Sequence, residues 1–248
     1  MLSQTTQTTT KLKQLKNMSG TNPTPNNLTQ VLFGPLTVNF TVATTYTLGQ
    51  LEYDENLFIP TNAFIAYNNV AGTNSTQAVV AIDNGTTGEN IATATLPATP
   101  IVAVDGSGNR SQTILTMTNP GYILGRSPVA NPNPLPTAAP SGAASVQSLR
   151  VNVTTAAIPS LATTNRSTTN NISTLTVASV PSWLTAGTMV DILTVGNVGY
   201  NGSVSIISVT STTISYYNPS VATEASTADT AGRIGALQGN VYVAGFLI

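Results

Sequence analysis

The amino-acid sequence predicts an all-β protein, with an N-terminal extended arm and two β-sandwich or barrel-like domains that a proline-rich linker joins. Apolar and polar residues alternate over short stretches, which is the period of half-buried strands. Turn residues separate these stretches about every eight to twelve positions, as in sandwiches and barrels. Only residues 48–57 have any helical character, and that stretch is too short to change the fold class. At 248 residues the chain can bury one large β core or two small ones.

Residues 1–30 are expected to form a polar arm. They hold every lysine of the chain and too few apolar residues to offset the entropy that ordering would cost. We therefore expect a neighbouring subunit to order the arm, while a solvated tail is the simpler alternative. The residues that we predict to contact this subunit are Lys11, Leu12, Lys13, Leu15 and Lys16.

Residues 31–120 are expected to form the first β domain, with about seven strands. The strand patterns cover residues 36–43, 57–59, 63–67, 77–82, 91–96, 100–104 and 112–117. Two of the turns between them, Asp83-Asn84-Gly85 and residues 105–109, carry oxygen ligands that calcium could use. Neither matches the EF-hand loop with its terminal Glu, so we favour ordinary turns at both places.

Residues 121–145 are rich in proline, alanine and serine, and such a segment favours an extended, semi-rigid spacer. We expect it to be the linker that carries the chain into the second β domain, residues 146–248. That domain ends in an apolar strand at residues 239–248, which we expect to pair within a sheet.

The stretch from residue 172 to 219 has the clearest strand patterns of the chain. Residues 173–178 alternate between polar and apolar, and residues 189–195 form a second apolar run. Asn201-Gly202 is a strong hairpin signal, and two further strands follow it. We expect a small antiparallel module of four strands. Its predicted core residues are Val190, Ile192, Val204 and Val209.

This pattern resembles the small β modules of tailed-bacteriophage virion proteins. The likeness rests on the Thr- and Ser-rich first strand and on AGTMVDILTVGNVGYNGSVSIISVTSTTISYYNPS at residues 186–220, where Gly187, Asn201 and Gly202 are turn residues. It covers about a fifth of the chain. Such modules occur in capsid decoration proteins, tail proteins and fibres. The resemblance therefore implies a location in the virion, and it brings no catalytic residue.

The chain is unusually poor in charge. Charged residues make up 7% of it, against about 25% in an average protein, while hydrophobic residues make up an ordinary 41%. Thr, Asn, Ser and Gln supply the polarity, and such side chains lose less than charges do when they are desolvated. This composition suits a subunit that packs against neighbours, although a secreted or fibrous β protein can have the same bias. We expect no nucleic-acid partner at a formal net charge of −1. We also expect no membrane span and no signal peptide.

The absence of histidine and cysteine removes Ser-His-Asp and thiol catalysis, disulfides and Cys- or His-based metal sites. Glu52, Asp54 and Glu55 lie close together in the sequence, but a glycosidase needs two carboxylates on opposite sides of a cleft. A solvated turn or a partner contact is the better interpretation of these acids. We predict no enzymatic activity, no cofactor and no metal.

We expect a structural protein of the virion, and foremost a head decoration (cement) protein that binds the major capsid protein or other virion subunits. The resemblance implies a homo-oligomer, with a trimer favoured. A tail, baseplate or fibre component is the alternative, followed by a bacterial surface adhesin or a carbohydrate-binding module. Trp183 and Tyr200 are further candidate partner contacts on distal loops, although for Trp183 a plug of the core is the more common role of such a residue.

Overall fold

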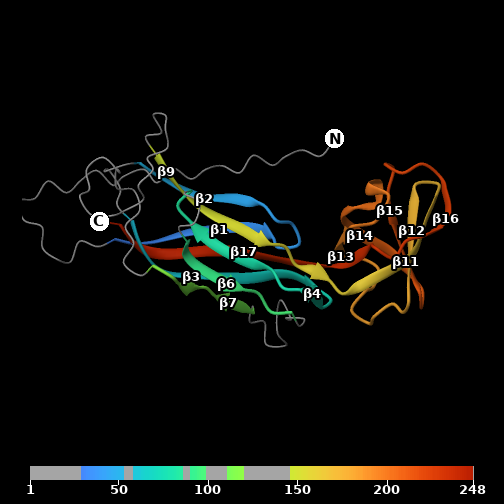
Figure 1. Cartoon of the computed structure of the whole chain (residues 1–248), viewed down its shortest axis with the longest axis horizontal. Helices are drawn as coiled ribbons and strands as arrows, with labels where there is room; N and C mark the ends of the chain where they lie inside the picture. Colours follow the sequence, from blue (N-terminus) through green and yellow to red (C-terminus); the bar gives the residue numbers. More distant parts are fainter. Residues whose placement is uncertain (1–28, 53–57, 86–89, 99–110, 120–145, 248) are drawn as a thin grey trace, which may run out of the picture.

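The computed structural model describes residues 29–52, 58–85, 90–98, 111–119 and 146–247 (Figure 1). The strands are β1 (Thr29–Asn39), β2 (Thr45–Glu52), β3 (Phe58–Ala71), β4 (Asn74–Thr76), β5 (Val79–Asp83), β6 (Asn90–Thr95), β7 (Gln112–Ile114), β8 (Thr116–Met117), β9 (Val146–Thr155), β10 (Ile158–Pro159), β11 (Leu161–Thr169), β12 (Ile172–Val177), β13 (Met189–Leu193), β14 (Gly202–Val209), β15 (Thr213–Tyr217), β16 (Glu224–Ala228) and β17 (Arg233–Leu247). A 3-10 turn, η1 (Val198–Tyr200), lies between β13 and β14. All strand pairs are antiparallel, which confirms the all-β class. Within the described ranges, no helix has the length and apolar character to span a membrane.

Strands β1 to β3, β5 to β9 and the C-terminal half of β17 form a two-layered sandwich, and β4 pairs with β10 in a separate two-stranded sheet. One layer has the order β1–β17–β3–β7, and the other has the order β2–β9–β5–β6–β8. Both layers contribute to one core, which includes Ile65 and Val241 from the first layer and Ile82 and Val151 from the second. All four side chains are completely buried, as the alternation of apolar residues in these strands requires.

The remaining strands form a barrel. They are ordered β11–β12–β15–β14–β13–β17, and β17 pairs with β11 again, so that the sheet closes on itself. Strand β16 is attached to the outside edge of β11. The barrel has its own core, in which Leu175, Ile192, Ile214 and Ile234 are fully buried. Closure removes the free edges that a short sheet of this kind would otherwise expose.

Strand β17 belongs to both parts and runs from the barrel into the sandwich (Figure 1). Ile234 and Ala236 point into the barrel, whereas Leu237 and Val241 point into the sandwich core. Side chains alternate across a strand, so the even-numbered residues of β17 form one face and the odd-numbered residues form the other. The even-numbered face is buried in the barrel, and in the C-terminal half of β17 it is the outer face of the sandwich. Gly235 lies at this crossing, where an added Cβ would be 2.7 Å from Cβ of Pro159. The two parts therefore meet at a corner around residues 235–238.

Several sequence predictions are confirmed. The expected strands at residues 77–82, 91–96 and 173–178 overlap β5, β6 and β12, whereas the one expected at 112–117 is divided into β7 and β8, which lie in different layers. The strands expected at residues 57–59 and 63–67 form a single strand, β3, in the part described. The stretch with helical character, residues 48–57, begins inside strand β2. The C-terminal apolar strand pairs with β1 and β3.

The two cores divide the chain differently from the predicted domains. Strand β9, which we expected to open a second domain at residue 146, pairs with β2 and β5 and places Leu149 in the sandwich core. Strand β8 lies in the same sheet, so the strands on both sides of residues 121–145 belong to one core. The change of core falls after Ala157. The arm, the linker, and the segments 53–57 and 100–109 lie outside the described residues.

Candidate functional site

Every charged side chain that the structure describes is engaged within the chain. These residues are Asp83, Arg150, Arg166, Asp191, Glu224, Asp229 and Arg233. Arg150 forms an ion pair with Asp83 at 2.8 Å. Arg233 donates to three backbone carbonyls of the preceding turn, those of residues 230, 231 and 232. Beside these engaged groups, the exposed side chains in the described part of the chain are hydroxyl, amide and apolar ones.

A polar cluster occupies one end of the barrel. Arg166 on β11 pairs with Glu224 at 3.1 Å and also with Asp229. Its guanidinium lies 5.8 Å from the centroid of the Tyr200 ring. The Tyr200 hydroxyl donates to Glu224 at 2.9 Å and accepts from Thr168 at 2.7 Å. Each buried polar atom of this cluster thus has a partner, as a stable interior requires.

The two acids of the cluster are held ionised. Burial alone would raise the pKa of Asp229, but hydrogen bonds from the Gly196 backbone and Arg166, and from the backbone of Gly232 and Ala231, outweigh it and lower that pKa. Burial likewise acts to raise the pKa of Glu224, and donors led by the Tyr200 hydroxyl lower it overall. Ionised, fully bonded acids of this kind stabilise a fold, and they are not poised to exchange protons.

The two predicted aromatic contacts have different surroundings. Tyr200 is only 1% exposed, because η1 folds its ring over the end of the barrel core. The ring is therefore a core plug and does not offer a surface to a partner. Trp183 is half-buried and packs against the barrel core. A Cβ on Gly72, at the end of β3, would lie 2.9 Å from the Trp183 ring, so this ring fills the contact between barrel and sandwich. The predicted contacts at residues 11–16 lie outside the described part of the chain.

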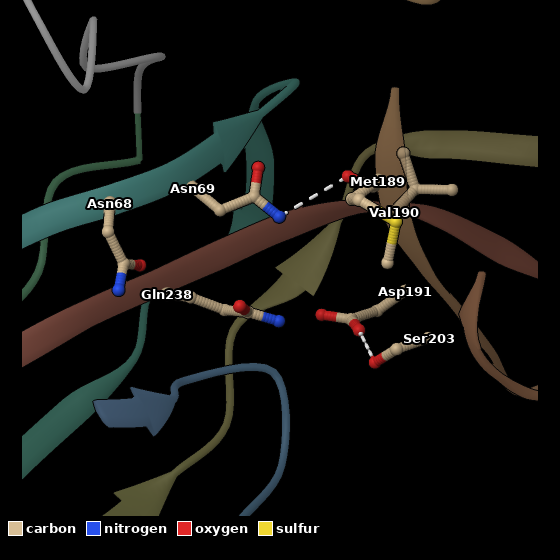
Figure 2. Close-up of a pocket in the computed structure, with 7 residues that line it drawn as sticks. All are labelled: Asn68, Asn69, Met189, Val190, Asp191, Ser203 and Gln238. Carbon is tan, nitrogen blue, oxygen red and sulfur yellow. Dashed lines mark hydrogen bonds between the residues drawn. The ribbon is translucent and has the colours of Figure 1, made fainter. Parts of the chain in front are cut away.

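An open pocket lies in the corner between barrel and sandwich, with a volume of about 520 Å³. Asn68, Asn69 and Gln238 line it from β3 and β17, and Met189, Val190, Asp191 and Ser203 line it from β13 and β14 (Figure 2). The pairing of Gln238 with Asn69 sets two amides side by side on the outer face of the sandwich. Sequence reasoning missed this pocket, because residues 120 positions apart along the chain meet there.

Among the described residues that line the pocket, Asp191 is the single charged one, and it is 2% exposed. One carboxylate oxygen accepts from Asn39 at 3.1 Å and from Thr41 at 3.0 Å, and the other accepts from Ser203. These bonds connect a barrel strand to the end of β1. Asp191 therefore fixes the geometry of the corner, and its carboxylate is fully supplied with neutral donors.

An apolar row crosses the outer face of the sandwich beside this pocket. It consists of Ile114, Phe64 and Tyr242, which stand opposite one another on β7, β3 and β17. The rings of Phe64 and Tyr242 are stacked at 4.8 Å, and Ile114 is 65% exposed. Leu32 on β1 is exposed on the same face, opposite Ala244. This row is a continuous uncharged surface for contact.

Among the described residues, no three His, Cys, Asp or Glu side chains come together as a metal site would need. The acids gathered at the barrel end and in the corner pocket are bonded to the chain's own donors. Comparison of the chain with models of protein families, with curated proteins and with solved structures found no match in any of the three.

Proposed function

We propose that this protein is a non-enzymatic structural subunit of a tailed-phage virion, and that it decorates and stabilises the head. The observation that carries this proposal is the engagement of the described charged side chains inside the chain, which leaves few free charges on the outer surface of the described part. Hydroxyl and amide groups cost far less to desolvate than charges, so such a surface can be covered over a large area by neighbours. A net charge close to zero also favours association over dispersal.

The likeness of residues 172–219 to virion β modules supports the choice of assembly. The barrel that contains this stretch has its own buried core, and its loop at η1 presents Val198, which is 80% exposed. On the sandwich, the apolar row provides a flat contact surface of the kind that buries well against a neighbour. We propose that the row faces the capsid shell and that the barrel projects away from it.

Decoration stabilises a shell by mass action. A subunit that binds only the assembled lattice shifts the equilibrium toward that lattice, in proportion to its concentration over its dissociation constant. The predicted arm of residues 1–30 would add contacts to the same or an adjacent capsid subunit. By analogy with the virion modules we propose a homo-oligomer, most simply a trimer, because several weak contacts then act together.

The experiment that tests this function is immuno-electron microscopy of the parent particles with serum against the purified protein. Label spread over the head is the expected result. Label confined to the tail or baseplate would contradict decoration and favour the tail alternative. Particles without label, in a preparation where the serum detects the protein on a blot after disruption, would place it inside the particle and also contradict decoration.

A pair of variants tests the contact surface. Ile114→Asp puts a charge into the apolar row, and Val198→Asp puts the same charge on an exposed barrel loop. Both side chains are exposed, so the fold should tolerate both changes. In a reconstitution assay on undecorated heads, we expect Ile114→Asp to abolish binding and Val198→Asp to leave it unchanged. The opposite result would assign the capsid contact to the barrel.

A further inference from the structure

The corner pocket between barrel and sandwich contains amide groups whose hydrogen-bonding capacity the fold leaves partly unused. Gln238 forms no side-chain hydrogen bond within the described part of the chain. Asn69 donates to the carbonyl of Met189 at 3.3 Å, and Asn68 donates to Asn240 at 3.3 Å, so the side-chain oxygens of both remain available as acceptors. Figure 2 shows these three amides on one side of the opening and Asp191 with Ser203 on the other. From these groups we propose that the pocket binds a neutral saccharide.

The charge of the pocket selects an uncharged ligand. No basic residue is among the described residues that line it, so these residues offer no counter-charge to a phosphate, sulfate or carboxylate group. Its one acid, Asp191, already accepts from Asn39, Thr41 and Ser203, so little of its bonding capacity remains for a cation. What remains open is a set of amide donors and acceptors beside a serine hydroxyl. Vicinal hydroxyl groups, which both donate and accept, match such a set.

The shape and lining of the pocket agree with a sugar ring. Its volume of about 520 Å³ falls within the range of roughly 300–1,000 Å³ that small-molecule sites occupy. Met189 is 48% exposed at its wall, and it offers an adaptable apolar surface to the C–H face of a pyranose. Pockets between two structural parts are also among the preferred places for ligands.

The outer face of β17 extends the site in one direction. Asn240 follows Gln238 on this face, and its side-chain oxygen accepts from Thr37 at 2.9 Å. Tyr242 comes next, about 13 Å from Gln238 at the usual rise of a strand. An oligosaccharide that occupies the pocket can therefore continue along the polar strip at Asn240 and end short of the Tyr242 ring, which belongs to the proposed capsid contact. We accordingly expect an oligosaccharide to bind more tightly than a monosaccharide.

A glycan array that carries both neutral and acidic oligosaccharides tests the proposal, followed by titration calorimetry with the best neutral ligand. The central variant is Gln238→Ala, because its amide makes no bond in the fold and its loss should not affect stability. Each lost hydrogen bond should weaken binding about five- to tenfold. Asn69→Ala should have a similar effect. The matched control is Thr45→Ala, a polar truncation on β2, which lies in the other layer of the sandwich.

Binding of neutral glycans that both pocket variants weaken, and that Thr45→Ala leaves intact, would support the proposal. It would be overturned by an array on which no neutral glycan binds, by binding confined to acidic glycans, or by neutral binding that both pocket variants retain. None of these outcomes depends on decoration of the head, since the assay uses the purified full chain alone.

Discussion

Removal of the Asp229 carboxylate should destabilise the barrel strongly. Its side chain is 2% exposed, and it accepts from the Gly196 backbone at 2.8 Å, from the Ala231 and Gly232 backbone at 3.2 Å each, and from Arg166. Asp229→Ala would remove the acceptor of three backbone N–H groups and of the Nη1 group of Arg166. Breaking a buried pair in this way costs about 3–5 kcal/mol.

For a protein of this size, each kcal/mol lowers the melting temperature by about 2–4 °C, so we expect Asp229→Ala to lose about 6–20 °C. The assay is thermal unfolding followed by the fluorescence of Trp183, which is the single tryptophan and packs against the barrel core. Thr37→Ala on the exposed face of β1 is the control and should change the melting temperature by less than about 2 °C. A loss below about 2 °C for Asp229→Ala would refute the view that this cluster holds the barrel together.

Three further predictions concern the same parts of the molecule. Gly72→Ala introduces a Cβ 2.9 Å from the Trp183 ring at a residue with φ of +81°, so it should lower the free energy of unfolding by about 1–3 kcal/mol. It should also shift the fluorescence emission of Trp183 to longer wavelength. Unchanged emission would contradict the packing at this junction. Both Asp229 and Glu224 have lowered pKa values in the folded state, so the stability that they contribute is complete above the pKa values of free carboxylic acids and is lost as the pH falls through the lowered pKa values of the folded protein. The melting temperature of the barrel should therefore be constant from pH 7 to 5 and fall below about pH 4. A constant melting temperature down to pH 2 would exclude this linkage. Ile234→Ala removes a fully buried side chain from the part of β17 in the barrel and should lower the free energy of unfolding in urea by about 2–5 kcal/mol. Because β17 belongs to both cores, we expect far-ultraviolet circular dichroism and fluorescence to report one transition. Separate transitions would show that barrel and sandwich unfold independently.

Local pattern predicted the strands whose inward side chains are apolar. Tyr216 is buried and Tyr217 is 61% exposed, as the alternation of a strand requires. Strand β11 escaped this reasoning, because its inward residues are Thr163 and Thr168, whose hydroxyls are buried and hydrogen-bonded. A usable signal was nevertheless present. Asn170 and Asn171 both have positive φ and form the two-residue turn between β11 and β12, which this dipeptide favours.

The hairpin expected at Asn201-Gly202 forms, but its turn is different. Gly202 is already the first residue of β14 and stands opposite Ile192 on β13. The chain between them folds into η1, and the Asn201 side chain accepts from the backbone of Val195 at 2.9 Å. Local sequence could indicate that a reversal occurs here. It could not show that the longer loop would bury Tyr200, since the partners of that hydroxyl come from β11 and β16.

Composition was a poor guide to where one core ends and the next begins. A proline-rich stretch reports the stiffness of the chain, and it carries no information on which strands pair across it. The pairing of β2 with β9 joins Thr45 to Asn152, and no local pattern specifies a contact of that span. The corner pocket depends on the same kind of long-range pairing. Asn68-Asn69 has the local sequence of a turn and predicts one, yet both residues lie within β3.

The position of β17 in the chain has a consequence for biosynthesis. This strand follows every other described strand in chain order, yet it is central in the sandwich layer and also closes the barrel. A nascent chain that has not yet been synthesised through residue 233 lacks a wall of the barrel, and one that stops before residue 247 lacks part of the strand between β1 and β3. Neither part can therefore finish folding during translation of the preceding residues. Folding of the barrel and of the sandwich is thereby coupled through one strand, so we expect a chain that lacks β17 to be degraded by proteases.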